Sequence, residues 1–113
     1  MKKKMVMAIT GSISASSAHE YLIYLNQFFD VTVIMTENSK KFINTNVLGY
    51  YSSGIYDKLF FKNETPHISI SSKADYFIVL PASANMIGKA SFGIADDLVS
   101  TTILAYNKPI IFF

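Results

Sequence analysis

The sequence has no cysteine among its 113 residues, and this absence removes several kinds of site at once. Disulfide bonds, thiolate nucleophiles and thiolate metal ligands all require cysteine. Only two histidines are present, His19 and His67, and they lie far apart along the chain. Two such histidines make a poor zinc site, even if Asp96 and Asp97 added oxygen ligands. We therefore expect no bound metal.

Long apolar runs are also missing. The first apolar run, residues 5–9, is soon interrupted by Gly11 and Ser12, so it is typical of a strand rather than of a signal peptide. No stretch approaches the roughly 20 apolar residues of a membrane helix, and the default expectation is a cytoplasmic protein. The net charge of +2 comes largely from the lysines at 2–4, without a basic face. Nucleic acid is therefore not an expected partner.

Two common catalytic and cofactor motifs are absent as well. Residues 11–14 contain one glycine where the dinucleotide motif Gly-x-Gly-x-x-Gly needs three, which disfavours an NAD site. The pattern Gly-x-Ser-x-Gly of many hydrolases does not occur. Ser83, His67 and Asp75 could form a catalytic triad by residue type, but without that pattern a hydrolase is not the favoured interpretation.

Half of the residues are apolar, enough for one packed domain over residues 1–113. Short apolar, β-branched runs predict strands buried on both faces. Apolar residues at steps of three and four predict helices, and Gly93 divides two of them. Residues 44–72 carry weaker signals and are predicted to be mostly loop and short helix. The predicted strands are 4–10, 31–35, 76–80 and 110–113; the predicted helices lie within 15–29, after 36–39 through 42, from about 86, and over 96–105.

Strands that alternate with helices predict an α/β fold, a Rossmann-like parallel sheet with helices on both faces. Ligands of such sheets bind outside the carboxyl ends of the strands. The loops to consider are 11–14, 36–39 and 81–85, whose small polar residues suit an anion at a helix start. A phosphate-bearing ligand is one hypothesis, and ordinary turns with helix caps are the other. Asp96 and Asp97 fit the cap of the last helix.

The third loop and the residues after it carry a family resemblance. The segments Pro81-Ala82-Ser83-Ala84-Asn85, Lys89-Ala90 and 93–98 (Gly-Ile-Ala-Asp-Asp-Leu) resemble the signature of the homo-oligomeric flavin-containing cysteine decarboxylases. Thr10-Gly11-Ser12-Ile13 and the lone His67 extend the resemblance over essentially the whole chain. Residues 42–45 (Phe-Ile-Asn-Thr) are more similar to the lantibiotic, epidermin-type branch than to the coenzyme A branch.

The resemblance implies a flavoprotein domain with bound FMN. The positions that match the family's cofactor contacts are Gly11, Ser12, Ile13, Thr36, Ser83, Ala84, Asn85 and Met86. His67 matches the family's essential histidine and is expected to act as a base. The implied reaction oxidises a carboxyl-terminal cysteine of a precursor peptide to a thioaldehyde, which loses CO₂ and leaves an aminoenethiol. The implied assembly is a homotrimer or a homododecamer.

The chain also departs from the family pattern. It stops at Phe113, before the Pro-x-Met-Asn loop and the substrate-covering segment of the family, so the fold is expected to be truncated at its carboxyl end. Met86 replaces the usual threonine. We therefore expect slow or absent decarboxylation by the 113-residue form. The alternatives are a phosphopantothenoylcysteine decarboxylase-like enzyme and a non-catalytic flavin-binding protein, whereas the third motif disfavours a flavin prenyltransferase.

Overall fold

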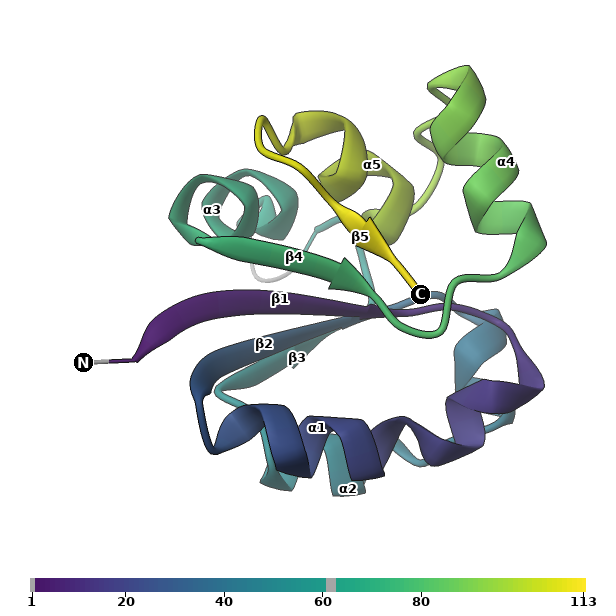
Figure 1. Cartoon of the computed structure of the whole chain (residues 1–113). Coiled ribbons are helices and arrows are strands. Elements are labelled where there is room, and N and C mark those ends of the chain that lie inside the picture. Colours follow the sequence, from purple (N-terminus) through teal and green to yellow (C-terminus); the bar gives the residue numbers. More distant parts are fainter. Residues whose placement is uncertain (1, 61–62) are drawn as a thin grey trace.

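The computed structural model describes residues 2–60 and 63–113, which form a five-stranded parallel sheet (Figure 1). The strand order is β3-β2-β1-β4-β5. β2 and β3 are therefore added on one side of β1, and β4 and β5 on its other side. Ligands of open α/β sheets bind at such a reversal of the strand order. The predicted Rossmann-like sheet is therefore confirmed. The strands are β1 (Lys3–Ile9), β2 (Phe29–Met35), β3 (Gly54–Tyr56), β4 (Tyr76–Val79) and β5 (Ile111–Phe112).

Helices cover the two faces of the sheet and make three layers (Figure 1). One face carries α1 and α2, and the other carries α3, α4 and α5. Two 3₁₀ turns, η1 and η2, follow β1 and β2 at their carboxyl ends. The helical elements are η1 (Ile13–Ser17), α1 (Ala18–Asn26), η2 (Asn38–Lys41), α2 (Thr45–Tyr50), α3 (Pro66–Lys73), α4 (Ala84–Phe92) and α5 (Leu98–Ala105).

The central strand β1 explains why its sequence is a continuous apolar run. Met5, Met7 and Ile9 pack into the core on the α1 side, while Val6 and Ala8 pack into the core on the α5 side. Side chains of a strand point alternately to the two faces, so a strand covered on both faces must be apolar at every position. The predictions for β1, β2 and β4 rest on this pattern.

The first predicted helix differs from the structure at both ends. Its start is the 3₁₀ turn η1, and the α-helix proper ends at Asn26. The expected apolar stripe includes Phe28 and Phe29, but Phe29 begins β2 and pairs with Lys3 of β1. Backbone hydrogen bonding along the whole of β1 decides this boundary, and helical periodicity alone does not reveal it.

The prediction of mostly loop and short helix over residues 44–72 is confirmed by the short helices α2 and α3 and is wrong for strand β3. Strand β3 has three residues, pairs with β2 from Thr32 opposite Gly54, and is too short to show a pattern. Helix α3 begins with Pro66 at its first turn and carries several serines, so its sequence resembles a loop. The helix packs on the sheet through Ile70, and Ala74, which follows the helix, is buried in the same core.

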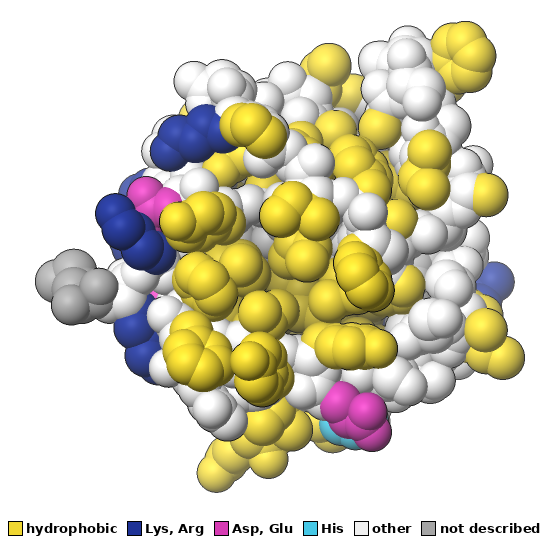
Figure 2. Space-filling view, in the orientation of Figure 1, with side chains coloured by type: hydrophobic (Ala, Val, Ile, Leu, Met, Phe, Trp, Pro, Cys, Tyr) yellow, Lys and Arg dark blue, Asp and Glu magenta, His cyan; other side chains and the backbone are white. Residues whose placement is uncertain are grey.

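One region of the α1 face is bare. Figure 2 shows a broad apolar surface where α1 lies beside β4 and β5. A hollow of about 160 Å³ in this surface is lined by Tyr21, Tyr24, Leu25, Ile78, Leu80 and Phe113. The helices of this face cover the other half of the sheet, and the rings of Tyr21, Tyr24 and Phe113 remain exposed. In the described part of the chain, every helix is too short or too polar to cross a membrane.

Candidate functional site

Three loops meet at the carboxyl edge of the sheet, where β1, β2 and β4 end. Thr10, fully buried, ties two of them together: its hydroxyl donates to the carbonyl oxygen of Pro81 at 2.7 Å and accepts from the N–H of Ser83 at 2.7 Å. The N–H of Thr36 donates to the carbonyl oxygen of Ile9 at 3.1 Å and ties in the third loop. These bonds fix the relative positions of loops that are up to 73 residues apart.

A pocket of about 380 Å³ opens between these loops. Its size lies in the range of roughly 300–1,000 Å³ that is usual for small-molecule sites. Six of the nine residues expected from the sequence line it, and they come from all three loops. The lining consists of Gly11, Thr36, Glu37, Asn38, Ser83, Ala84, Asn85, Met86, Lys89 and Asp97.

Gly11 allows the first two loops to approach each other closely. A Cβ atom added at Gly11 would lie 2.6 Å from the Cβ of Asn38, which is closer than real side-chain contacts. Any other residue would push η2 and the end of β1 apart and so reshape the pocket. The requirement for glycine here is therefore a matter of space.

The amino-terminal end of α4 supplies hydrogen-bond donors to the pocket. Ser83 caps the helix, and its hydroxyl accepts from the N–H of Met86 at 3.1 Å. Within the first turn, the N–H groups of Ala84 and Asn85 have no carbonyl of their own helix to bond. Such N–H groups, together with the positive end of the helix dipole, favour an anion. The residues present thus fit the phosphate of a nucleotide cofactor.

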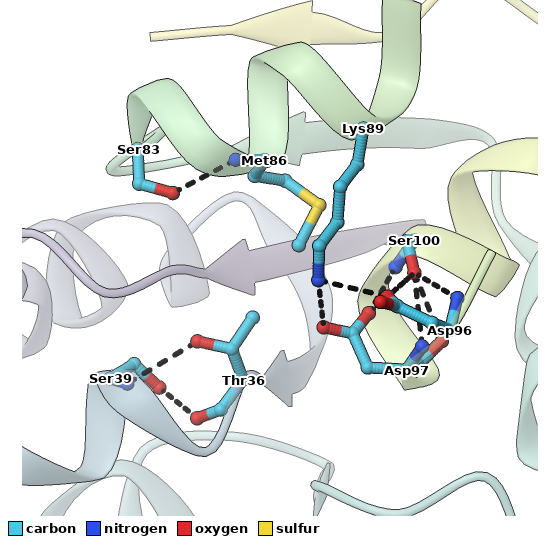
Figure 3. Close-up of polar contacts among 8 residues, drawn as sticks. All are labelled: Thr36, Ser39, Ser83, Met86, Lys89, Asp96, Asp97 and Ser100. Carbon is cyan, nitrogen blue, oxygen red and sulfur yellow. Dashed lines mark hydrogen bonds and ion pairs between the residues drawn. The ribbon is translucent and has the colours of Figure 1, made fainter. Parts of the chain in front are cut away.

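Thr36 contributes a hydroxyl group from the second loop. Its Oγ1 accepts from the N–H of Ser39 at 3.3 Å, and its carbonyl oxygen accepts from the hydroxyl of Ser39 at 2.7 Å (Figure 3). Because the Thr36 hydroxyl acts as an acceptor in that bond, its own hydrogen is available to a ligand. The residue therefore combines a capping role with a place in the pocket wall.

A charged cluster that the sequence analysis did not place in the site forms another wall. Lys89, from α4, lies 2.8 Å from Asp96 and 3.5 Å from Asp97, measured from Nζ to carboxylate oxygens (Figure 3). The hydrogen bond from Lys89 lowers the pKa of Asp96, and the same bond raises the pKa of Lys89. Lys89 and Asp96 are therefore both charged near neutral pH. The Lys89-Ala90 pair belongs to the family resemblance, but only the fold brings it to the pocket.

Asp97 also caps α5, as expected from the sequence. Its carboxylate accepts from the N–H of Ser100 at 2.7 Å, and the hydroxyl of Ser100 accepts from the N–H of Asp97 at 3.1 Å. This reciprocal capping box holds the start of α5 against the pocket. The interpretation of Asp97 as a helix cap is confirmed, and its second position, in the pocket wall, is new.

The other expected residues lie outside the pocket lining. Ser12 caps η1 by accepting from the N–H of Ser14, and the side chain of Ile13 is 77% exposed. His67 is the second residue of α3, not part of an irregular segment as expected. Its Nδ1 is buried without a hydrogen-bond partner among the described residues.

The catalytic triad considered from the sequence is not assembled in the structure. Asp75 precedes β4, where its carboxylate accepts from the N–H of Lys4 at 2.9 Å, whereas Ser83 follows the opposite end of the same strand. Within the described residues, no three His, Asp or Glu side chains gather as a possible metal site.

Comparison with known proteins gives consistent results. The model of the Flavoprotein family matches residues 1–113. Epidermin decarboxylase from Staphylococcus epidermidis is 38% identical over 117 residues, which cover 99% of this chain and 62% of the relative. A probable phosphopantothenoylcysteine decarboxylase from Streptococcus mutans is 34% identical over 110 residues, covering 93% of this chain and 62% of the relative. The chain thus spans about six-tenths of these relatives.

A solved structure shares the fold. It contains a histidine-to-asparagine variant of EpiD, a peptidyl-cysteine decarboxylase, with the substrate peptide DSYTC. This structure has a TM-score of 0.89 and 35% sequence identity, and the match covers 99% of this chain and 65% of the other. The peptide in that complex ends in cysteine.

Proposed function

The chain belongs to the flavoprotein family, and from this premise we propose that it binds FMN in the pocket at the carboxyl edge of the sheet. We further propose that it serves the oxidative decarboxylation of a cysteine at the carboxyl end of a lantibiotic precursor peptide. The observation that carries the proposal is the pocket itself, which gathers six of the residues that the family resemblance assigns to FMN. The epidermin relative supports the choice of substrate.

Different pocket residues would contact different parts of FMN. The N–H groups at the start of α4 would hold the phosphate, because they have no partner within their helix and lie at the positive end of its dipole. The hydroxyls of Thr36 and Ser83 and the amide of Asn85 would bond the polar chain of the cofactor. Met86, which is 1% exposed, adds an apolar surface to the wall. Gly11 keeps the space between the first two loops.

When bound, FMN would supply the two-electron oxidation that a cysteine side chain needs to become a thioaldehyde. In this proposal, His67 takes the proton released from the thiol, and its Nε2 is the atom assigned to this step because Nδ1 is buried. The electrons of the broken bond to the carboxylate then move into the thioaldehyde, CO₂ leaves and an enethiolate remains. The protein contributes by orienting the peptide and by holding this proton.

His67 is not among the residues that line the pocket, and this separation supports a site shared between copies of the chain. We propose that His67 of one copy meets the pocket of its neighbour in a homotrimer or homododecamer. The bare apolar surface beside α1 is consistent with association, because monomeric proteins rarely expose large apolar patches. The assembly would also remove water from around the histidine.

Light scattering of the purified protein tests this assembly. We expect a mass of three chains or a multiple of three, with FMN bound to that species. A monomer that binds FMN fully and decarboxylates a cysteine-ended peptide would contradict the shared site.

A second candidate substrate comes from the coenzyme A branch, since a probable phosphopantothenoylcysteine decarboxylase is nearly as similar as the epidermin enzyme. Release of CO₂ from a cysteine-ended peptide and from phosphopantothenoylcysteine separates the two. In the chain extended by the part of epidermin decarboxylase that it does not match, we expect turnover of the peptide only. Turnover of phosphopantothenoylcysteine alone would assign the chain to the other branch, and FMN binding without either reaction would favour the non-catalytic flavin-binding protein.

Replacing Ser83 and Asn85 with bulky residues tests the pocket. Asn85→Trp is the sharper variant, because Asn85 is exposed and its replacement leaves the core and the Ser83 cap intact. We expect FMN affinity to fall at least tenfold, or about 1.4 kcal/mol, as the indole fills the pocket. The readout is quenching of flavin fluorescence on binding. The matched control is Asn107→Trp, an exposed site after α5. Unchanged FMN binding by Asn85→Trp would remove the cofactor from this pocket.

A further inference from the structure

We propose that Lys89 is a positioning residue that offsets part of the negative charge of Asp96 and Asp97, so that phosphate can bind nearby without a direct ion pair to the lysine. The inference rests on the proposed binding of FMN in the pocket. It assigns to Lys89 a function that acts through its two acidic partners.

The charges around the pocket create a difficulty for an anionic ligand. Glu37 and Asp97 line it, and Asp96 adjoins it through Lys89. Glu37 already pairs with Lys40, whose Nζ lies 3.0 Å from its carboxylate, so Asp96 and Asp97 are the charges that remain. A phosphate monoester carries about −1.5 to −2 charges near neutral pH. Uncompensated carboxylates in the wall would repel such a group, and the repulsion would be stronger in the partly buried pocket than in water.

Asp97 is held in this wall by its part in the fold. It forms the capping box of α5 with Ser100, whose hydroxyl also accepts from the N–H of Asp96 at 3.1 Å. The negative charge of Asp97 is therefore tied to the capping of α5, the helix on this side of the pocket. A cation beside Asp97 allows the cap to remain while an anion binds in the pocket.

Lys89 meets the geometric conditions for this compensation. Its ammonium group lies 2.8 Å from Asp96 and 3.5 Å from Asp97, and its side chain is only 18% exposed. Figure 3 shows the lysine extending from α4 toward both carboxylates at the start of α5. It is the one cationic residue among the described residues that line the pocket. Because both carboxylates already engage it, the phosphate is left to the backbone N–H groups of α4.

The test is a charge-compensation series measured with FMN and with riboflavin, which lacks the phosphate. Lys89→Met keeps an unbranched side chain and leaves two uncompensated carboxylates. The triple variant Lys89→Met, Asp96→Asn, Asp97→Asn removes all three charges, and asparagine is as good a helix cap as aspartate. Lys89→Arg retains the cation. The control is Lys108→Met, on the exposed turn before β5.

We expect Lys89→Met to raise the FMN dissociation constant about tenfold at low salt and to change riboflavin binding less than about twofold. The triple variant and Lys89→Arg should both return FMN binding to within about threefold of the unaltered chain. The loss in Lys89→Met should shrink as salt screens the repulsion. Thermal unfolding of each variant verifies that it is folded.

Two results would overturn the inference while leaving FMN binding in place. Failure of the triple variant to recover would show that Lys89 contacts the phosphate directly. An equal loss of FMN and riboflavin would show that the lysine only holds α4 and α5 together. If the unaltered chain bound neither flavin, the proposed function and this inference would both be overturned.

Discussion

Replacing His67 with asparagine is expected to slow CO₂ release from a cysteine-ended peptide by about 10²- to 10⁴-fold, the usual contribution of a general base. FMN affinity should change less than about twofold, because His67 does not line the cofactor pocket. Asparagine keeps a polar side chain at the second position of α3, where the residue is only partly buried, so the fold should persist. The expected pattern is therefore a protein that holds flavin but does not turn over.

The measurement is best made on two forms of the protein. One is the 113-residue chain itself. The other is the same chain extended by the part of epidermin decarboxylase that it does not match, since it spans about six-tenths of that relative. The matched control is His19→Asn in α1, the other histidine of the sequence. Unchanged turnover in the His67→Asn form would remove this histidine from the mechanism.

Truncating Phe77 to alanine is expected to destabilise the fold by about 3–5 kcal/mol. Phe77 lies in β4, is 1% exposed, and packs edge-to-face on Tyr106 with 5.3 Å between ring centroids. Removing the ring leaves a cavity between the sheet and α5 and deletes an aromatic contact. A domain of this size has a total stability of roughly 5–15 kcal/mol, so the variant should unfold at much lower urea concentration.

The matched control is Phe92→Ala, the same truncation at the end of α4, where the ring is 84% exposed. This variant should change the free energy of unfolding by less than about 0.5 kcal/mol. Urea unfolding followed by far-ultraviolet circular dichroism compares the two. Similar losses in both variants would contradict the division of the molecule into a buried core over β4 and a solvent-exposed α4 end.

Interactions between neighbours in the sequence made much of the fold predictable. β1 is apolar at successive positions because both faces of the sheet are covered there. Ser83 and Asp97 cap α4 and α5 through bonds to residues three positions ahead. Gly93 ends α4 in the left-handed conformation, with φ of 70°, which glycine adopts without strain. Each of these features depends on the residue itself and its near neighbours.

The site could be predicted only in part. The loops after β1, β2 and β4 were expected because parallel strands end at one edge of the sheet, and Gly11, Thr36 and residues 83–86 do lie together there. Lys89 and Asp97 were not expected, because their place in the wall depends on how α4 and α5 pack. Ser12 and Ile13 belong to the expected loop after β1, but they form the start of the η1 turn and do not line the pocket.

The sequence by itself determined the class of fold, the main strands, the helix caps and the edge of the sheet where a ligand is expected. Those features depend on local periodicity and capping, which need no knowledge of distant residues. Only the tertiary structure decided the existence of β3, the bounds of α3, the hydrogen bonds of Thr10 to Pro81 and Ser83, the charge pairing of Lys89, and the separation of His67 from the pocket. These features arise from hydrogen bonds and packing between elements that the fold brings together, and their geometry is set by the whole chain.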